Sequence, residues 1–114
     1  MQIIVREKER EWSPHPQAEG VKRKLLISKA EQGENITCML VKIPKGAEVP
    51  IHTHASESDI FYTISGKCKI WADGLGDFEV DKGTVVRIPK GIRHKIHDVE
   101  QDTLLYDVFS PAIR

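Results

Sequence analysis

The chain has 114 residues, which is room for one domain rather than two. With 39% hydrophobic and 30% charged residues, its composition is that of a globular protein and excludes a disordered or fibrous chain. Seventeen basic residues balance 17 acidic ones, which argues against nucleic acid or a membrane surface as the main partner, because both attract a basic excess. A charged N-terminal region without a signal-like apolar stretch predicts a cytoplasmic protein, and Cys38 and Cys68, with no CxxC pairing, predict free thiols.

Residues 1–20 are polar and contain proline, so we expect an N-terminal arm followed by a single barrel domain over residues 21–114. Helix formers over residues 6–12 favour a short helix that the following Ser-Pro-His-Pro sequence ends. Ahead of it, Ile3, Ile4 and Val5 read as a β-branched strand. Because an open sheet has an edge that needs cover, this strand is expected to pair with a second copy of the chain in a homodimer.

The rest of the chain consists of short apolar or alternating runs between turn formers, which indicates an all-β sandwich or barrel. The expected strands are 24–28, 36–43, 60–65, 67–71, 78–80, 84–88, 95–99 and 103–109. Asp73-Gly74 and Ser65-Gly66 each offer a glycine for a tight hairpin.

Three histidines and a carboxylate form the main chemical signal. His52 and His54 are two residues apart, so in a strand they point to the same side. Asp59 and His94 each stand at the head of a later strand. Three imidazoles and one carboxylate suit one divalent metal among Fe, Mn, Co, Ni, Cu and Zn, with open positions for chemistry. Glu57 is the alternative carboxylate ligand.

At these positions the sequence resembles the cupin family. The first family motif, G-x5-H-x-H-x(3,4)-E-x6-G, and the second, G-x5-P-x-G-x2-H-x3-N, are both present, with Asp replacing Glu and Asn. The matching residues are Gly46, His52, His54, Asp59 and Gly66, then Gly83, Pro89, Gly91, His94 and Asp98. The resemblance implies a cupin jelly roll, a double-stranded β-helix with the metal inside one mouth. Asp98 is then expected to order the turn after His94 or to orient a ligand, and His97 to face the other side.

The last strand carries a second signal, because alternation puts Leu105, Asp107 and Phe109 on one face. If that face is the lumen, Asp107 is a candidate general base with a raised pKa; the alternative is a structural carboxylate on the outer face. Phe61 and Phe109 are the candidate substrate-pocket residues. The ending Asp-Val-Phe-Ser-Pro is similar to that of the cupins that linearise unsaturated uronates from pectin and alginate, whose following arginine is shifted here to Arg114.

These features predict a mononuclear metal enzyme that isomerises or tautomerises a small sugar-acid or ketone metabolite. The same ligand set also suits a dioxygenase that binds substrate and O₂ at the open positions. A third hypothesis is a small-molecule-binding cupin without catalysis. Metal identity, oxygen uptake and the presence of a tightly held metabolite separate the three.

Overall fold

The computed structural model describes residues 2–114 and consists mainly of strands. Its strands are β1 (Ser13–Pro14), β2 (Lys22–Ile27), β3 (Thr37–Ile43), β4 (Val49–His52), β5 (Ser58–Ala72), β6 (Gly76–Asp81), β7 (Val85–Ile88) and β8 (His94–Ser110). A 3₁₀ turn, η1 (Glu7–Glu9), and one short helix, α1 (Lys29–Gln32), complete the elements. The all-β jelly-roll prediction is confirmed.

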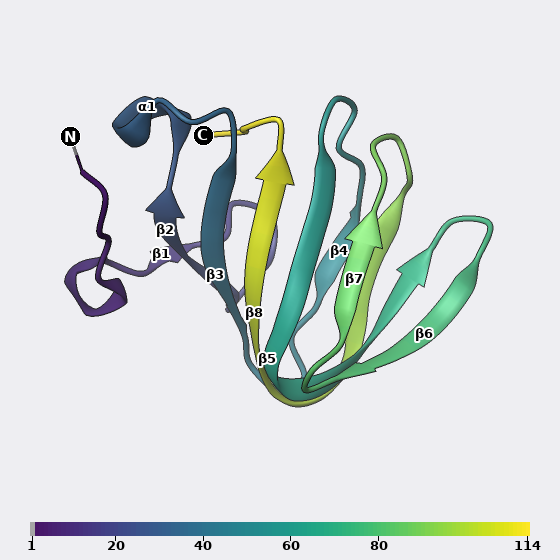
Figure 1. The fold of residues 1–114 in the computed structure, drawn as a ribbon. Helices are drawn as coiled ribbons and strands as arrows, with labels where there is room; N and C mark the ends of the chain where they lie inside the picture. The colour runs from purple at the N-terminus through teal and green to yellow at the C-terminus, as the bar shows by residue number, and fades with distance from the viewer. Residues whose placement is uncertain (1) are drawn as a thin grey trace.

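Strands β5 and β8 organise the fold, because they pair with each other along nearly their whole lengths, from Ser58 opposite Ser110 to Ala72 opposite His94. The strand order is β1-β2-β3-β8-β5-β6, with β4 also pairing β8 and β7 also pairing β5. Figure 1 shows both long strands bending through the bottom of a U-shaped molecule. Each of them therefore belongs to both walls of the barrel.

The bend in β5 passes through Gly66, where the φ angle is +103°. A β carbon built on Gly66 falls 2.5 Å from Thr103 Cα and 2.6 Å from the Asp102 carbonyl oxygen. The register between β5 and β8 shifts on both sides of this point, so the close approach of the two backbones needs a residue without a side chain. The second long strand bends with the help of Asp98, a non-glycine residue with a φ of +47°.

The core lies between the two walls and is made by alternate residues of the long strands. Phe61, Ile70 and Leu105 are each at most 2% exposed, while Ile60 and Tyr62, on either side of Phe61, face outward. This alternation is the period of two that a strand imposes, with one face buried and one solvated.

Three local predictions were wrong. Ser65-Gly66 forms no hairpin but lies inside β5, and the two runs predicted around it are one bent strand. The strands predicted at 95–99 and 103–109 are likewise one strand, β8. The predicted helix over residues 6–12 is only the turn η1, because its charged residues bury no face. The Asp73-Gly74 hairpin is confirmed, with Ala72 pairing Gly76 across it.

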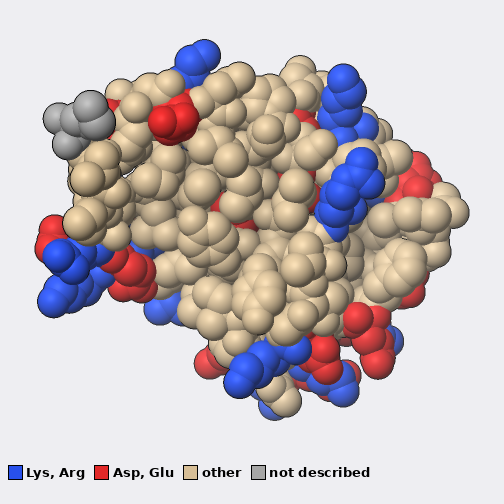
Figure 2. All heavy atoms as spheres, viewed as in Figure 1, with Lys and Arg blue, Asp and Glu red and all other residues tan. Residues whose placement is uncertain are grey.

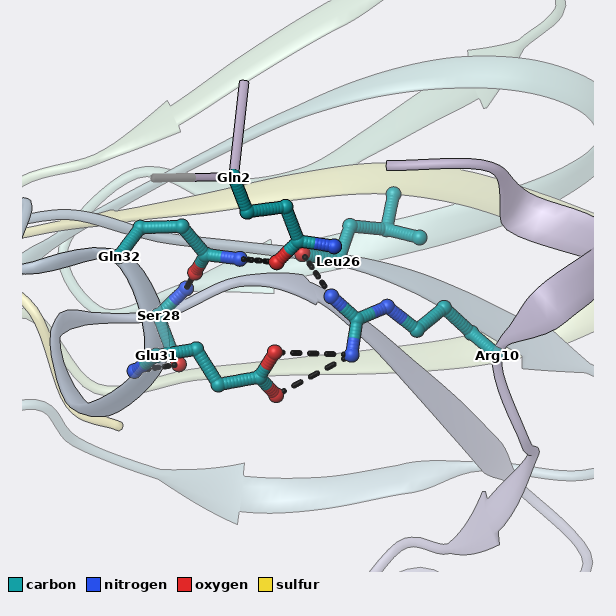
Figure 3. A network of polar contacts seen from close by, with 6 residues as sticks. All are labelled: Gln2, Arg10, Leu26, Ser28, Glu31 and Gln32. Carbon is teal, nitrogen blue, oxygen red and sulfur yellow. Dashed lines mark hydrogen bonds and ion pairs between the residues drawn. The ribbon is translucent and has the colours of Figure 1, made fainter. Parts of the chain in front are cut away.

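The N-terminal arm is held against its own chain. Arg10 pairs with Glu31 at 2.9 Å and also contacts the Leu26 carbonyl, while the Gln32 amide donates to the Gln2 side chain at 2.8 Å (Figure 3). Ile3 and Ile4 are exposed and form no strand within the chain. Their pairing with a second copy stays a prediction.

On the face seen in Figure 2, charged side chains of both signs gather around the rim and the middle is largely uncharged. Cys38 and Cys68 are both buried free thiols, as predicted. Across residues 2–114, no helix has the length and apolar character needed to cross a bilayer.

Candidate metal centre

The two walls bring the four predicted ligands together at the open end of the U. His52, the last residue of β4, pairs in register with His94, the first residue of β8. Asp59, near the start of β5, pairs with Phe109 near the end of β8. The two ends of β8 thus carry His94 and the strand partner of Asp59, so the bend of β8 sets the distance between His94 and Asp59 across the barrel.

The ligand atoms of His52, His54, Asp59 and His94 all lie within 4.8 Å of one another. Asp59 Oδ2 is 3.7 Å from His54 Nε2 and 3.8 Å from His94 Nε2. His94 and Asp59 are buried, whereas His52 and His54 are partly exposed at the mouth. Glu57 is outside this group, with its carboxylate 3.5 Å from the other ring nitrogen of His54.

Backbone carbonyls fix which imidazole nitrogen carries the proton. His52 Nδ1 lies 2.8 Å from the Pro50 carbonyl oxygen, and His94 Nδ1 lies 2.9 Å from that of Ile92. A carbonyl only accepts, so each Nδ1 must donate and each Nε2 keeps a free lone pair. Metal-ligating histidines are commonly oriented in this way, with one ring nitrogen donating to a backbone carbonyl and the other left free for the metal.

The loops of the two motifs are joined by the backbone. Gly91, with a φ of +82°, donates its N–H to the His54 carbonyl at 2.8 Å. The loop before His94 is thereby attached to the loop that carries His54. The spacing of proline, glycine and histidine in the second motif thus has a direct structural reason.

Within the described residues, His54 Nε2, His94 Nε2 and one oxygen of Asp59 are buried without any hydrogen-bond partner. Buried polar atoms are almost always satisfied, and three such atoms facing one another are costly unless something binds between them. Two imidazole lone pairs and a carboxylate oxygen match the donor set of a divalent transition metal. The residues present therefore fit a divalent transition metal.

Asp107 is buried and lines the same cavity as Asp59. Burial raises the pKa of Asp107 well above its usual value, and the charge of Asp59 raises it further. Burial also acts to raise the pKa of Asp59, but the proximity of Asp107, His94 and His54 outweighs it, and the pKa is lowered. Of the two carboxyl groups, Asp107 is the one whose protonated form is favoured.

The cavity around this cluster has a volume of about 170 Å³. Phe61, Phe109 and Leu105 line it, so the face of β8 that carries Asp107 is the inner one. The ring of Phe109 meets that of His54 edge-on at 5.1 Å between centroids. The cavity thus combines an apolar wall with polar groups at one end, as small-molecule sites commonly do.

His97 and Asp98 lie outside the cavity. His97 Nε2 is 2.7 Å from Asp77 Oδ1, and Asp98 is beside Lys69 with its side chain 57% exposed. The expected position of His97 on the opposite face agrees with this. Asp98 shapes β8 through its backbone and does not contact the four-residue cluster.

Sequence reasoning missed His15 and Arg23, which also line the cavity. His15 Nδ1 accepts a hydrogen bond from the Gln17 backbone at 3.1 Å, and burial lowers the pKa of His15 to about 4, with Arg23 adding to the effect. No local pattern marks His15. Arg23 could have been found from its spacing, because it lies two residues before Leu25 on the same strand and Leu25 faces inward.

Comparison with known proteins adds the family. Residues 39–109 match the family model described as "Cupin domain". An uncharacterised protein of Streptomyces coelicolor is 30% identical over 77 residues, which cover 68% of this chain and 71% of that protein.

Solved structures share the fold over nearly the whole chain. KdgF from a Halomonas species has a TM-score of 0.82 at 23% identity, covering 97% of this chain and 94% of that one. A predicted oxalate decarboxylase from Thermotoga maritima has a TM-score of 0.83 at 23% identity, covering 96% and 99%. At these identities the likeness concerns the fold and carries no activity across.

Proposed function

This chain belongs to the cupin family, and we propose that it is a mononuclear metal-dependent enzyme that isomerises or tautomerises a small sugar-acid or ketone metabolite. The observation that carries the proposal is the group of buried, unpartnered ligand atoms of His54, Asp59 and His94 beside the buried carboxyl group of Asp107. A structural metal site needs no cavity and no proton donor next to it.

His52, His54, Asp59 and His94 would hold the metal through three imidazole Nε2 atoms and one carboxylate oxygen. When bound, a divalent metal supplies a Lewis acid that polarises a substrate oxygen. The protein's own contribution is orientation. The Pro50 and Ile92 carbonyls fix two of the rings, and the lowered pKa of Asp59 favours its anionic form.

Asp107 is the group that would move a proton. Its raised pKa favours the protonated form, so it would enter as a donor to a substrate carbon or oxygen. After donation its carboxylate can collect the proton released elsewhere on the substrate, and a tautomerisation needs both events. Phe61 and Phe109 form apolar walls that exclude water from this transfer.

Unsaturated uronates are the first substrates to test, because the Asp-Val-Phe-Ser-Pro ending is similar to that of the cupins that linearise them. The metal content of the purified protein is measured first by elemental analysis. Turnover of unsaturated uronates without oxygen uptake, abolished by the double substitution His52→Ala and His94→Ala, supports the proposal. Oxygen consumption in step with substrate loss assigns a dioxygenase instead, and a tightly held metabolite without turnover assigns a binding protein.

We also propose that the protein is a homodimer. Large apolar side chains stay exposed on the outer face of neighbouring strands, with Tyr62 46% and Tyr106 37% exposed and paired in register across β5 and β8. Ile60 and Ile64, each 36% exposed, extend this face along β5. Contiguous apolar surface of this kind is typical of an interface between subunits.

A further inference from the structure

Arg23 stands on the inner face of β2 and reaches the cavity that holds the metal cluster. Its register partner on β3 is Val41, whose own partner on β8 is Leu105. The two residues next to Arg23 in this row are therefore apolar. Arg23 also lines an adjoining cavity together with Arg114, so it contributes to the walls of both cavities.

The guanidinium of Arg23 has no partner among residues 2–114. Its side chain forms no hydrogen bond and no ion pair within the described part of the chain, and its Nε atom is buried and unsatisfied. Two other arginines are paired, Arg10 with Glu31 and Arg93 with Asp73. A partly buried charge without a partner costs stability, and proteins normally keep one only where it has a use.

The surroundings of Arg23 indicate that its missing partner is an anion. Burial lowers the pKa of Arg23, and the nearby positive charge of Arg114 lowers it further. A guanidinium nevertheless stays charged in proteins. Asp107 is the nearby carboxyl group that acts the other way, but within the described residues the Nε of Arg23 and one oxygen of Asp107 both stay without a hydrogen-bond partner. The charge of Arg23 is thus left for a ligand to neutralise.

We propose that Arg23 binds the carboxylate of the substrate and thereby selects acids over neutral sugars and ketones. The inference rests on the proposed function and deepens it, since it names the substrate group that the cavity recognises. Arg23 and the four-residue metal cluster line one cavity of about 170 Å³. A small acid held at its carboxylate by Arg23 would present its oxygenated carbons towards the cluster and Asp107.

A carboxylate suits the site better than a phosphate. The planar guanidinium fork accepts a carboxylate in two parallel hydrogen bonds. Arg23 is the one arginine among the described residues that line the metal cavity, while Arg114 lines only the adjoining one. One guanidinium matches the single charge of a carboxylate, whereas a phosphate monoester dianion calls for a second cation. His15, with a pKa of about 4, is neutral at pH 7 and does not supply it.

The test compares D-galacturonate with D-galactose, which has a neutral hydroxymethyl group in place of the carboxylate, and with D-galactose 6-phosphate. Binding is measured by calorimetry on the protein with its native metal, for the wild type, Arg23→Met and Arg23→Lys. Arg87→Met is the matched control, because Arg87 is an exposed arginine on β7 that does not line the metal cavity. Melting temperature is measured for each protein without sugar.

We expect the wild type and Arg87→Met to bind galacturonate about ten- to hundredfold more tightly than galactose, the range of a charged hydrogen-bonded pair. Arg23→Met should lose this preference, Arg23→Lys should keep part of it, and the unliganded melting temperature of Arg23→Met should be equal or higher. Equal binding of both sugars, no binding of any, or an unchanged preference in Arg23→Met overturns the inference. Tighter binding of the phosphate reassigns the site to phosphate esters, and a lower melting temperature of Arg23→Met makes Arg23 a structural residue.

The same titrations on the His52→Ala, His94→Ala variant separate this inference from the proposed function. If that variant still binds galacturonate more tightly than galactose, the preference is due to Arg23 and not to a bound metal. A wild type that carries no metal but keeps the preference disproves the metal enzyme and leaves the carboxylate site standing. A wild type that carries metal but binds both sugars equally disproves the carboxylate site and leaves the metal enzyme standing.

Discussion

Asp59 and Asp107 bring two buried carboxyl groups into one cavity. They stand diagonally on neighbouring strands, since Asp59 pairs with Phe109 and Asp107 pairs with Phe61. Two buried carboxyl groups this close resist being charged together, so their pKa values are driven apart. The pKa of Asp59 is lowered and that of Asp107 is raised, which favours Asp59 as the anion facing the histidines and Asp107 as the acid facing the cavity.

The substitution Asp107→Asn tests this division of roles. The amide that it introduces can donate a hydrogen bond to Asp59, so we expect the fold and the bound metal to be retained. Turnover should fall by about 10²–10⁴-fold, the usual loss when a general acid or base is removed. Elemental analysis and kinetics on one preparation check both halves. Loss of metal would instead make Asp107 a support for the ligand set, and unchanged turnover would remove it from the reaction.

Asp59→Asn, in contrast to Asp107→Asn, should lower the metal content. The substitution keeps the shape but removes the anion, so metal content should drop even where the protein remains folded. Circular dichroism verifies folding and elemental analysis gives the metal. Full metal retention would show that three histidines suffice.

Metal removal should lower thermal stability without unfolding the protein at 25 °C. A ligand that binds only the native state at 100 times its dissociation constant adds about 2.7 kcal/mol, which corresponds to about 10 °C in melting temperature for a domain of this size. A chelator titration followed by differential scanning calorimetry measures the shift. The His52→Ala, His94→Ala variant serves as the control, and an equal shift in that variant would place the metal elsewhere.

Acid should destabilise the protein through His15. Its pKa of about 4 lies below the value of 6.5 that it has when exposed, so between these values the unfolded chain binds the proton and the folded chain does not. The stability contribution is present above pH 6.5 and is lost as the pH falls towards 4. Protonation also removes the Nδ1 lone pair that accepts from Gln17.

His15→Asn isolates this effect, because an Asn oxygen can accept from the same backbone N–H but does not titrate in this range. Arg23, His52 and His54, whose charges also lower the pKa of His15, stay in place. The loss of unfolding free energy between pH 6.5 and 4.5 should be smaller in the variant by about 1 kcal/mol, allowing for the half-exposed position of His15. Identical pH profiles from denaturant titrations would contradict it.

Gly66→Ala should be strongly destabilising. The new β carbon would meet the backbone at Thr103 and Asp102, and the positive φ adds strain, for a total of about 3 kcal/mol or more. Gly83 is the matched control, since its φ is +88° but nothing lies within 4 Å of the added carbon. Its substitution should cost about 1 kcal/mol. Urea unfolding of both variants decides, and equal losses would show that φ alone matters at Gly66.

The proposed dimer is checked by light scattering, where a 12.9 kDa particle at micromolar concentration would refute it. Tyr62→Glu should weaken a dimer that packs through the outer face of β5 and β8, because it buries a charge. Deletion of residues 1–10 should weaken it only if the arm pairs with the partner. The two variants thereby distinguish the face from the arm.

Most of the strands and the ligand set could be predicted from the sequence because both are local patterns, but β1 and β4 were not among the expected strands. Alternation placed Leu105, Asp107 and Phe109 on one face, and the structure has all three buried. His52 and His54 are close in sequence, and the motif spacing related them to His94.

The continuity of the long strands could not be predicted in this way. Glycine favours a turn and a bulge alike, and the choice at Gly66 depends on Thr103, far along the chain. His15 and Arg23 were missed for a similar reason. They reach the cavity because β1 pairs with β2 and β2 with β3, and such pairings between distant segments leave no mark on the local sequence.

The bend of β5 and β8 has a mechanical consequence. The bend joins the two walls at one end of the barrel. At the opposite, open end, His52 and His94 lie on one wall and Asp59 lies on the other. A metal held by these residues would therefore cross-link the two walls at the end where the backbone does not join them. Amide hydrogen exchange should then slow on metal loading at His94 and Asp59, and stay unchanged at Lys67 and Gln101 beside the bend.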